Sequence, residues 1–204
     1  MKVDSEYNMT IPDFASNGCL PPFVNGNPTN PAHRSPYDTS MFQVVERFCS
    51  SGERAKLLLG LNEYRKHLFE GGFVSGSQWV DGSFVEDVEA KHNRPPSDID
   101  VVTLFHRPLK YQIDQATWVD DYQKTLHREF FDTGRMKATF RCDTYAIDLD
   151  AGASSLVRDT VYWGGLFSDI RGSTEKKGIL CIPLAVDKAE FFAVRDAIGR
   201  NCNV

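Results

Sequence analysis

Hydrophobic residues recur along the chain at two spacings, one typical of helices and one typical of strands. Over residues 53–69 they fall three or four positions apart, which predicts an amphipathic helix that two consecutive glycines would end. This apolar stripe consists of Leu57, Leu58, Leu61, Tyr64, Leu68 and Phe69. A first helix is expected over residues 41–48, with Thr39 or Ser40 as its N-cap.

Short apolar runs between turn residues predict a β-sheet in the rest of the chain. The expected strands cover residues 73–80, 98–105, 136–141, 144–149 and 178–183. Further helices are expected over residues 84–90, 116–131, 154–170 and 187–198. Because strands and helices alternate irregularly, the predicted fold class is α/β (α+β): a single domain with a mixed β-sheet flanked by helices.

The first 37 residues differ in composition from the rest. Residues 1–37 are rich in Pro, Asn, Ser and Gly, which does not support a helix or a central strand. We expect an extended arm that Phe14, Leu20 and Phe23 anchor to the surface of a domain formed by residues 38–204. A disordered tail is the alternative.

Polar residues with chemical potential lie where two of the predicted strands meet loops. Asp98 and Asp100 are one residue apart at the head of an apolar strand, so their side chains share a face. Paired carboxylates repel each other unless a cation lies between them, and Mg²⁺ prefers oxygen ligands. Gly82 and Ser83 form a turn where a phosphate could approach bare backbone N–H groups. A plain hairpin turn with solvated aspartates is the alternative.

This order of motifs resembles the signature of the polymerase-β-like nucleotidyltransferase superfamily: Gly-Ser, a polar loop, Asp-x-Asp, and a third carboxylate on a later strand. That resemblance makes Asp148 the third carboxylate, with Asp150 as the alternate. It covers residues 75–150, and the chain as a whole is similar to a poorly characterised bacterial family of predicted nucleotidyltransferases. The loop is slightly long for the superfamily, and a separate helical acceptor domain is lacking.

The resemblance implies a metal-dependent transfer of NMP from ATP or another NTP to an acceptor hydroxyl on a protein, an RNA or a small molecule. Asp98, Asp100 and Asp148 would bind Mg²⁺ or Mn²⁺, and Gly82 and Ser83 would bind the nucleotide phosphates. It also implies a protein partner within a bacterial toxin–antitoxin or defence module. The alternatives are a catalytically silent module of the same fold that binds a nucleotide or a partner, and a metal-dependent phosphohydrolase.

Charge adds a local expectation. Lys91 and Arg94 lie in the loop beside the turn, and three further basic residues cluster near the third strand; each group would contact a triphosphate or an acceptor, or simply be solvated. The second cluster is Arg135, Lys137 and Arg141. A net charge of −5 argues against extensive binding to duplex DNA.

The cysteines and the apolar runs bear on the compartment. Five scattered cysteines without a Cys-x-x-Cys motif argue against a disulfide framework and against a zinc site. No apolar run approaches the length of a membrane span, and the first residues lack the layout of a signal peptide. We therefore expect a cytoplasmic protein that does not contact a membrane.

Overall fold

A five-stranded mixed sheet forms the centre of the protein. The computed structural model describes residues 11–202. Its strands are β1 (Tyr37–Asp38), β2 (Gly76–Asp81), β3 (Ile99–Phe105), β4 (Cys142–Asp148) and β5 (Leu180–Pro183), in the spatial order β1-β5-β2-β3-β4. β2 is antiparallel to both of its neighbours, whereas β1 with β5 and β3 with β4 are parallel. The predicted α/β (α+β) fold class is confirmed.

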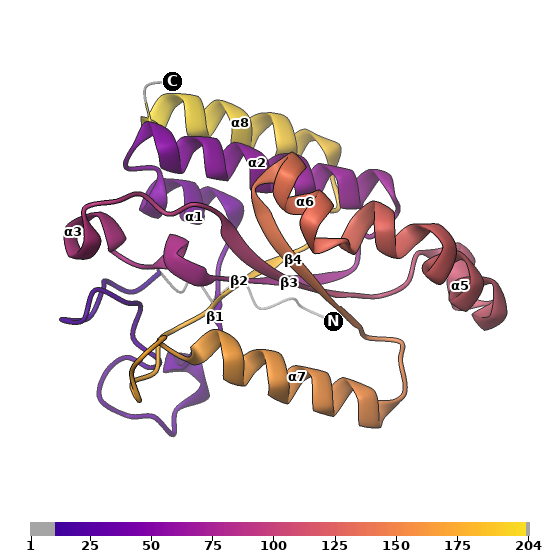
Figure 1. Cartoon of the computed structure of the whole chain (residues 1–204), viewed down its shortest axis with the longest axis horizontal. Coiled ribbons are helices and arrows are strands. Elements are labelled where there is room, and N and C mark those ends of the chain that lie inside the picture. The colour runs from indigo at the N-terminus through magenta and orange to yellow at the C-terminus, as the bar shows by residue number, and fades with distance from the viewer. Residues whose placement is uncertain (1–10, 203–204) are drawn as a thin grey trace, which may run out of the picture.

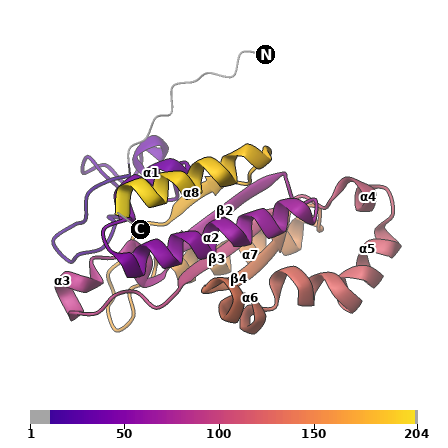
Figure 2. The ribbon, with the colours of Figure 1, turned by 90° about the horizontal axis from the view of Figure 1, so that it is seen from above.

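Helices cover the two faces of the sheet unequally (Figures 1 and 2). One face carries α1 (Met41–Phe48), α2 (Gly52–Glu70), α6 (Thr133–Phe140) and α8 (Lys188–Cys202). The other face carries α7 (Ala153–Ser168). The remaining short helices are η1 (Pro31–His33), η2 (Gly82–Val85), α3 (Val88–His92), α4 (Leu109–Gln112), α5 (Gln115–Asp121) and the π-helical segment η3 (Tyr122–Phe131).

The helical face buries the main core, as the apolar spacing predicts. Of the expected stripe on α2, five residues are at most 1% exposed: Leu57, Leu58, Leu61, Tyr64 and Leu68. α1 begins at a capping box, in which the Ser40 hydroxyl accepts from the backbone N–H of Gln43 and the Gln43 side chain accepts from that of Ser40. The expected N-cap at Ser40 is therefore confirmed.

A smaller core lies between α7 and the other face of the sheet. It contains Val102 and Leu104 from β3, Ile147 from β4, Phe167 from α7, and Ile179. Because side chains alternate along a strand, residues of β3 that lie an even number of positions from Val102 project to this same face. That rule fixes the face on which Asp100 lies.

The described part of the N-terminal arm, residues 11–37, packs against the domain. Leu20 is fully buried, and its carbonyl accepts a hydrogen bond of 2.7 Å from the N–H of Gly178. Cys19 is also fully buried and pairs with Glu86 as an isolated β-bridge. Residues 1–10 of the predicted arm lie outside the described residues.

One predicted strand is wrong. Residues 136–141 lie in and just after α6, which begins where the Asp132 side chain accepts from the backbone N–H of Arg135. The helix ends at Arg141, whose φ of 57° is left-handed. β4 therefore begins at Cys142, two residues earlier than the strand predicted over residues 144–149.

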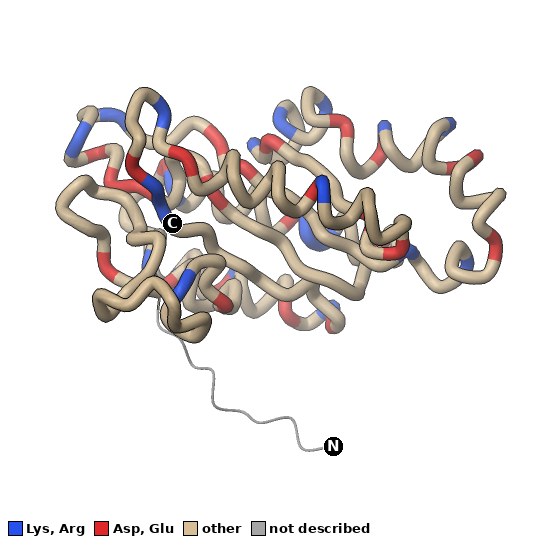
Figure 3. The backbone as a smooth tube through the Cα atoms, turned by 90° about the horizontal axis from the view of Figure 1, so that it is seen from below, with Lys and Arg blue, Asp and Glu red and all other residues tan. Residues whose placement is uncertain are grey.

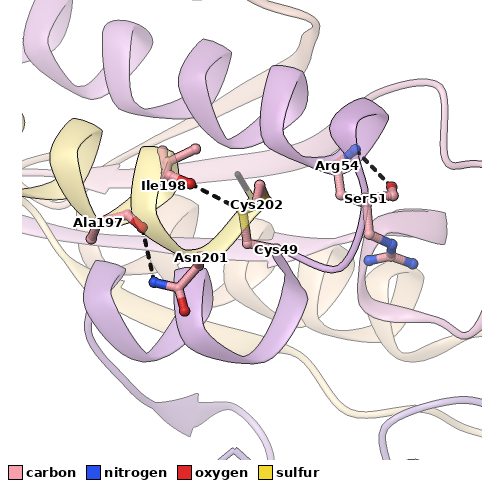
Figure 4. Close-up of a disulfide and its surroundings, with 7 residues drawn as sticks. All are labelled: Cys49, Ser51, Arg54, Ala197, Ile198, Asn201 and Cys202. Carbon is pink, nitrogen blue, oxygen red and sulfur yellow. Dashed lines mark hydrogen bonds between the residues drawn. A yellow bond between two sulfur atoms is a disulfide. The ribbon is translucent and has the colours of Figure 1, made fainter. Parts of the chain in front are cut away.

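The expectation that the cysteines are unpaired is also wrong. Cys49, at the end of α1, forms a disulfide with Cys202, at the end of α8 (Figure 4). The two cysteines are 153 positions apart in sequence, so their spacing alone gave no hint of the pairing. The disulfide joins two helices that contact each other over the main core (Figure 2).

None of the helices within residues 11–202 combines the length and the apolar character that a membrane span requires.

Candidate functional site

Three aspartates on neighbouring strands lie level with one another. In the ladder Asp81 of β2 is opposite Asp100 of β3, and Asp100 is in turn opposite Asp143 of β4. Directly opposed side chains lie on the same face of a sheet. Asp98, two residues before Asp100, projects to this face as well. The strand register thus gathers four carboxylates on the face that carries α7.

A lysine from α6 forms ion pairs with two of these carboxylates. The Lys137 Nζ lies 2.6 Å from the Asp98 Oδ2 and 3.1 Å from the Asp143 Oδ2. Hydrogen bonds to Asp98 and Asp143 raise the pKa of Lys137 above its ordinary value, because they favour the charged ammonium. One ammonium group therefore holds together carboxylates from two strands.

Asp100 lies at the centre of the row and is mostly buried. No lysine or arginine within the described part of the chain forms an ion pair with its carboxylate. Burial first, and then the charges of Asp98 and Asp143, raise the pKa of Asp100 to about 6. Its ionised form is therefore disfavoured, which is the condition that a bound cation would relieve.

The Gly82 turn closes one side of the row. Gly82 has a φ of +81°, and a Cβ atom on it would fall 1.9 Å from the Asp100 Oδ2. Only glycine can therefore occupy this position without moving the carboxylate. The half-buried Ser83 follows it in η2, so the predicted turn lies beside Asp100 through Gly82.

A second lysine, Lys177, contacts the residues on both sides of this turn. Lys177 is 5% exposed, and its Nζ lies 3.2 Å from the Asp81 Oδ2 and 2.8 Å from the Glu86 Oε1. The same ammonium donates to the carbonyl of Gly82 at 3.4 Å. Burial raises the pKa of Asp81 to about 7, although the charge of Lys177 opposes the shift. Lys177 thus links the two ends of the Gly-Ser turn to the edge of the row.

Asp148 does not lie with Asp98 and Asp100. It is level with Phe105, five residues beyond Asp100 along β3, or about 16 Å at 3.3 Å per residue. Its carboxylate pairs with Arg107, with a 2.7 Å contact to the Arg107 Nη2. The structure therefore brings Asp143, rather than Asp148, level with Asp100.

The alternate residue, Asp150, lies at the same far end. Its two oxygens accept from the His106 Nδ1 at 2.9 Å and from the backbone N–H of Arg107 at 2.8 Å. Those hydrogen bonds lower the pKa of Asp150, against the effect of burial. The five residues that line a small pocket of about 360 Å³ here are His106, Arg107, Gln112, Gln115 and Asp150.

The two basic residues expected to bind phosphate are also placed elsewhere. The side chain of Lys91 lies along Gly18 of the arm, and its Nζ is 3.9 Å from the Cys19 Sγ. Arg94 is exposed and donates to the carbonyl of Pro95. Neither side chain contacts the aspartate row, so their predicted role is not supported by a contact.

Sequence reasoning missed Asp143 and did not predict the ion pairs that Lys137 and Lys177 form with the aspartates. Asp143 is preceded by Cys142 and followed by Thr144, and both neighbours are fully buried. The available signal in the sequence was an acidic residue between Cys142 and Thr144, two residue types that strands accommodate in their interior. It was overlooked because the sequence prediction started the strand after it.

The donor set fits a hard divalent cation. Carboxylate oxygens from Asp98, Asp100 and Asp143 are the ligands that Mg²⁺ and Mn²⁺ prefer. The Asp143 Oδ1 is buried and has no hydrogen-bond partner, so it could still accept an interaction. Within residues 11–202, however, no group of three or more Asp, Glu, His or Cys side chains already has the geometry of a metal site. A metal would require Lys137 to move.

The fold and the site together define an α/β domain whose mixed sheet bears a row of aspartates beside a glycine turn. A family model described as "Family of unknown function (DUF6932)" matches residues 12–183. Because this match covers most of the chain, the protein belongs to that family. No match is found among the curated proteins or among the solved structures.

Proposed function

We propose that this protein is a metal-dependent nucleotidyltransferase that moves NMP from an NTP to an acceptor hydroxyl. The observation that carries the proposal is the register of β2, β3 and β4. It brings Asp100 and Asp143 level beside Asp98, with Gly82 in contact range of Asp100. This arrangement agrees with the proximity of the Gly-Ser turn and the Asp-x-Asp pair that the resemblance to the polymerase-β-like superfamily implies.

Each group has a role in that reaction. The acceptor oxygen would attack the α-phosphorus, and the bond from that phosphorus to the pyrophosphate oxygen would break. Asp98, Asp100 and Asp143 would hold Mg²⁺ or Mn²⁺, which neutralises phosphate charge and lowers the pKa of a bound hydroxyl. Gly82 leaves the backbone open to the β- and γ-phosphates, and the Ser83 hydroxyl can donate to them.

Transfer of a labelled nucleotide tests the proposal. The protein is incubated with each α-³²P-labelled NTP, Mg²⁺ or Mn²⁺, and a cell extract. The wild type should label an RNA, a protein or a small molecule, and Asp100→Asn and Asp143→Asn should not. Asp120→Asn is the matched control, because Asp120 is exposed on α5 and pairs with Lys124. Equal labelling by the wild type and Asp143→Asn would refute the assignment of the third carboxylate.

A silent binding module is the second candidate, and one observation favours it. Lys137 already neutralises Asp98 and Asp143 without a metal. Exposed apolar side chains on the outer surface of α7 would suit a protein partner, such as the second member of a toxin–antitoxin or defence pair. These residues are Val157, Val161, Tyr162 and Leu166. NTP binding without label transfer would favour this candidate, and phosphate release without transfer would favour a phosphohydrolase.

The distribution of charge bears on the class of acceptor. Acidic and basic residues are interspersed along the described chain (Figure 3). This distribution supports a small-molecule or protein acceptor over a long stretch of duplex DNA.

The cytoplasmic location also belongs to the proposal. The Cys49–Cys202 disulfide weighs against this location, because disulfides are rare in the cytoplasm. Alkylation of free thiols in rapidly quenched cells would report which redox state the protein holds there.

A further inference from the structure

We propose that Lys137 is a built-in cation that occupies the carboxylate site in the metal-free protein and leaves it when a divalent ion binds. This inference rests on the proposed function in treating the aspartate row as a metal site. It adds a means of regulation: the site would load metal only in competition with a side chain of its own chain.

The contacts of Lys137 are those that a metal would need. Its Nζ approaches one oxygen of Asp98 and one oxygen of Asp143, at 2.6 Å and 3.1 Å. Mg²⁺ binds carboxylate oxygens at about 2.0–2.1 Å, so it would have to approach the same oxygens more closely than the ammonium does. An ion that binds these two oxygens would occupy the position of the ammonium, so its binding there requires release of Lys137.

The surroundings allow the lysine to leave without disturbing the fold. The Lys137 side chain is 47% exposed, so water can solvate the released ammonium group. The helix that carries it is anchored independently, because the Thr133 hydroxyl donates to the carbonyl of Thr144 at 2.8 Å. Asp132 caps the same helix. The exchange therefore requires only a side-chain rotation.

A second observation indicates that the site has unused capacity for a cation. Asp81 is 4% exposed and lies opposite Asp100 in the ladder, and its Oδ1 has no hydrogen-bond partner. The Asp143 Oδ1 is likewise buried and without a partner. Lys137 leaves both oxygens and the whole Asp100 carboxylate unpaired. A divalent ion carries twice the charge of the ammonium and would compensate this excess better.

The other lysine at the site cannot perform this exchange. Lys177 is buried, and its ammonium is held by Asp81, Glu86 and the carbonyl of Gly82. Its removal would leave two acidic groups without a partner in the interior, which is costly. Exposure thus distinguishes the replaceable lysine from the fixed one.

Direct measurement of Mn²⁺ binding tests the inference. Free Mn²⁺ is followed by electron paramagnetic resonance during titration of the wild type, Lys137→Met, Lys137→Gln and the control Lys124→Met. Lys124 is an exposed lysine that pairs with Asp120 away from the site. Removal of the competing ammonium should tighten Mn²⁺ binding about fivefold in both Lys137 variants, the factor expected for a partly exposed ion pair. Binding by Lys124→Met should equal that of the wild type.

The outcomes separate this inference from the proposed function. Tighter Mn²⁺ binding by the Lys137 variants supports the exchange even if no nucleotide is transferred, in which case only the proposed function fails. Unchanged or weaker binding by both variants overturns the exchange, whatever the transfer assay shows. Absence of Mn²⁺ binding by every form of the protein also overturns it. If Lys137→Met does not fold, Lys137→Gln, which keeps a polar side chain of similar length, decides.

Discussion

Replacement of Asp100 by asparagine should stabilise the metal-free protein at neutral and alkaline pH. The substitution keeps the size of the side chain and removes a charge that the fold disfavours. The pKa of Asp100 is raised from its ordinary value of 3.8 to about 6 by burial and by the charges of Asp98 and Asp143. At about 1.36 kcal/mol for each pKa unit, this difference corresponds to about 3 kcal/mol of lost stability once Asp100 is ionised.

The effect has a defined sign and pH range. Between the unfolded value of 3.8 and the folded value of about 6, the folded protein binds more protons at Asp100 than the unfolded chain does. Stability therefore falls as the pH rises through this range and is level above it. The advantage of Asp100→Asn over the wild type should therefore be small at pH 4, grow through pH 5 and 6, and reach about 3 kcal/mol at pH 8.

Urea denaturation in EDTA at pH 4, 5, 6 and 8 measures this advantage directly. At pH 8 a gain of about 3 kcal/mol corresponds to a Tm increase of about 6–12 °C for a chain of this size. Asp120→Asn serves as the control, because Asp120 is exposed and distant from the aspartate row. The reasoning is refuted if Asp100→Asn is less stable than the wild type at pH 8, or if the difference between them does not change with pH.

Three further predictions follow from other contacts. Gly82→Ala places a methyl group against the Asp100 carboxylate at a left-handed φ, so it should abolish nucleotide transfer and lower the free energy of unfolding by about 1–2 kcal/mol. If urea denaturation gives Gly82→Ala the same free energy of unfolding as the wild type, the predicted clash is contradicted. Lys177→Met leaves Asp81 buried without its cation and should cost about 3–5 kcal/mol at pH 8. The cost should be smaller at pH 5, below the pKa of about 7 at Asp81, and a pH-independent cost would count against the ion pair. Cys202→Ser removes a disulfide that closes most of the chain and should cost about 2–4 kcal/mol. Dithiothreitol should lower the Tm of the wild type but not that of this variant, and an equal response would argue that no disulfide forms.

The sequence was sufficient where local spacing determines the structure. The stripe on α2 is buried because residues three and four positions apart lie on one side of a helix, whatever the rest of the chain does. Asp98 and Asp100 could be placed on one face for a similar reason, since side chains two positions apart in a strand project together. These inferences require no knowledge of which strands pair.

Asp143 was left out of the predicted strand because of one helix. Met136, Ala138 and Phe140 alternate with polar residues as in a strand, yet Asp132 caps a helix through this segment. Because the helix reaches Phe140, the next strand begins at Cys142 and includes Asp143. Asp148 is five positions further along β4. Because five is an odd number, Asp148 projects to the opposite face of the sheet from Asp143 as well as lying further along the strand.

The ion pairs of the two lysines could not be predicted, although the sequence placed Lys137 in a basic cluster near the third strand. Lys137 and Lys177 reach the aspartates only after α6 and the segment before β5 have packed, and no local pattern encodes that approach.

The two lysines differ in their burial and in the carboxylates that they contact. Lys177 is buried with Asp81, so it is a permanent partner whose loss would expose the turn to an unpaired charge. Lys137 is half-exposed and neutralises only part of the charge on the row, which leaves Asp100 destabilised. A protein selected for stability alone would gain by replacing Asp100. Under the proposed function, a divalent cation at the row would compensate the charge of Asp100, which Lys137 leaves without an ion pair.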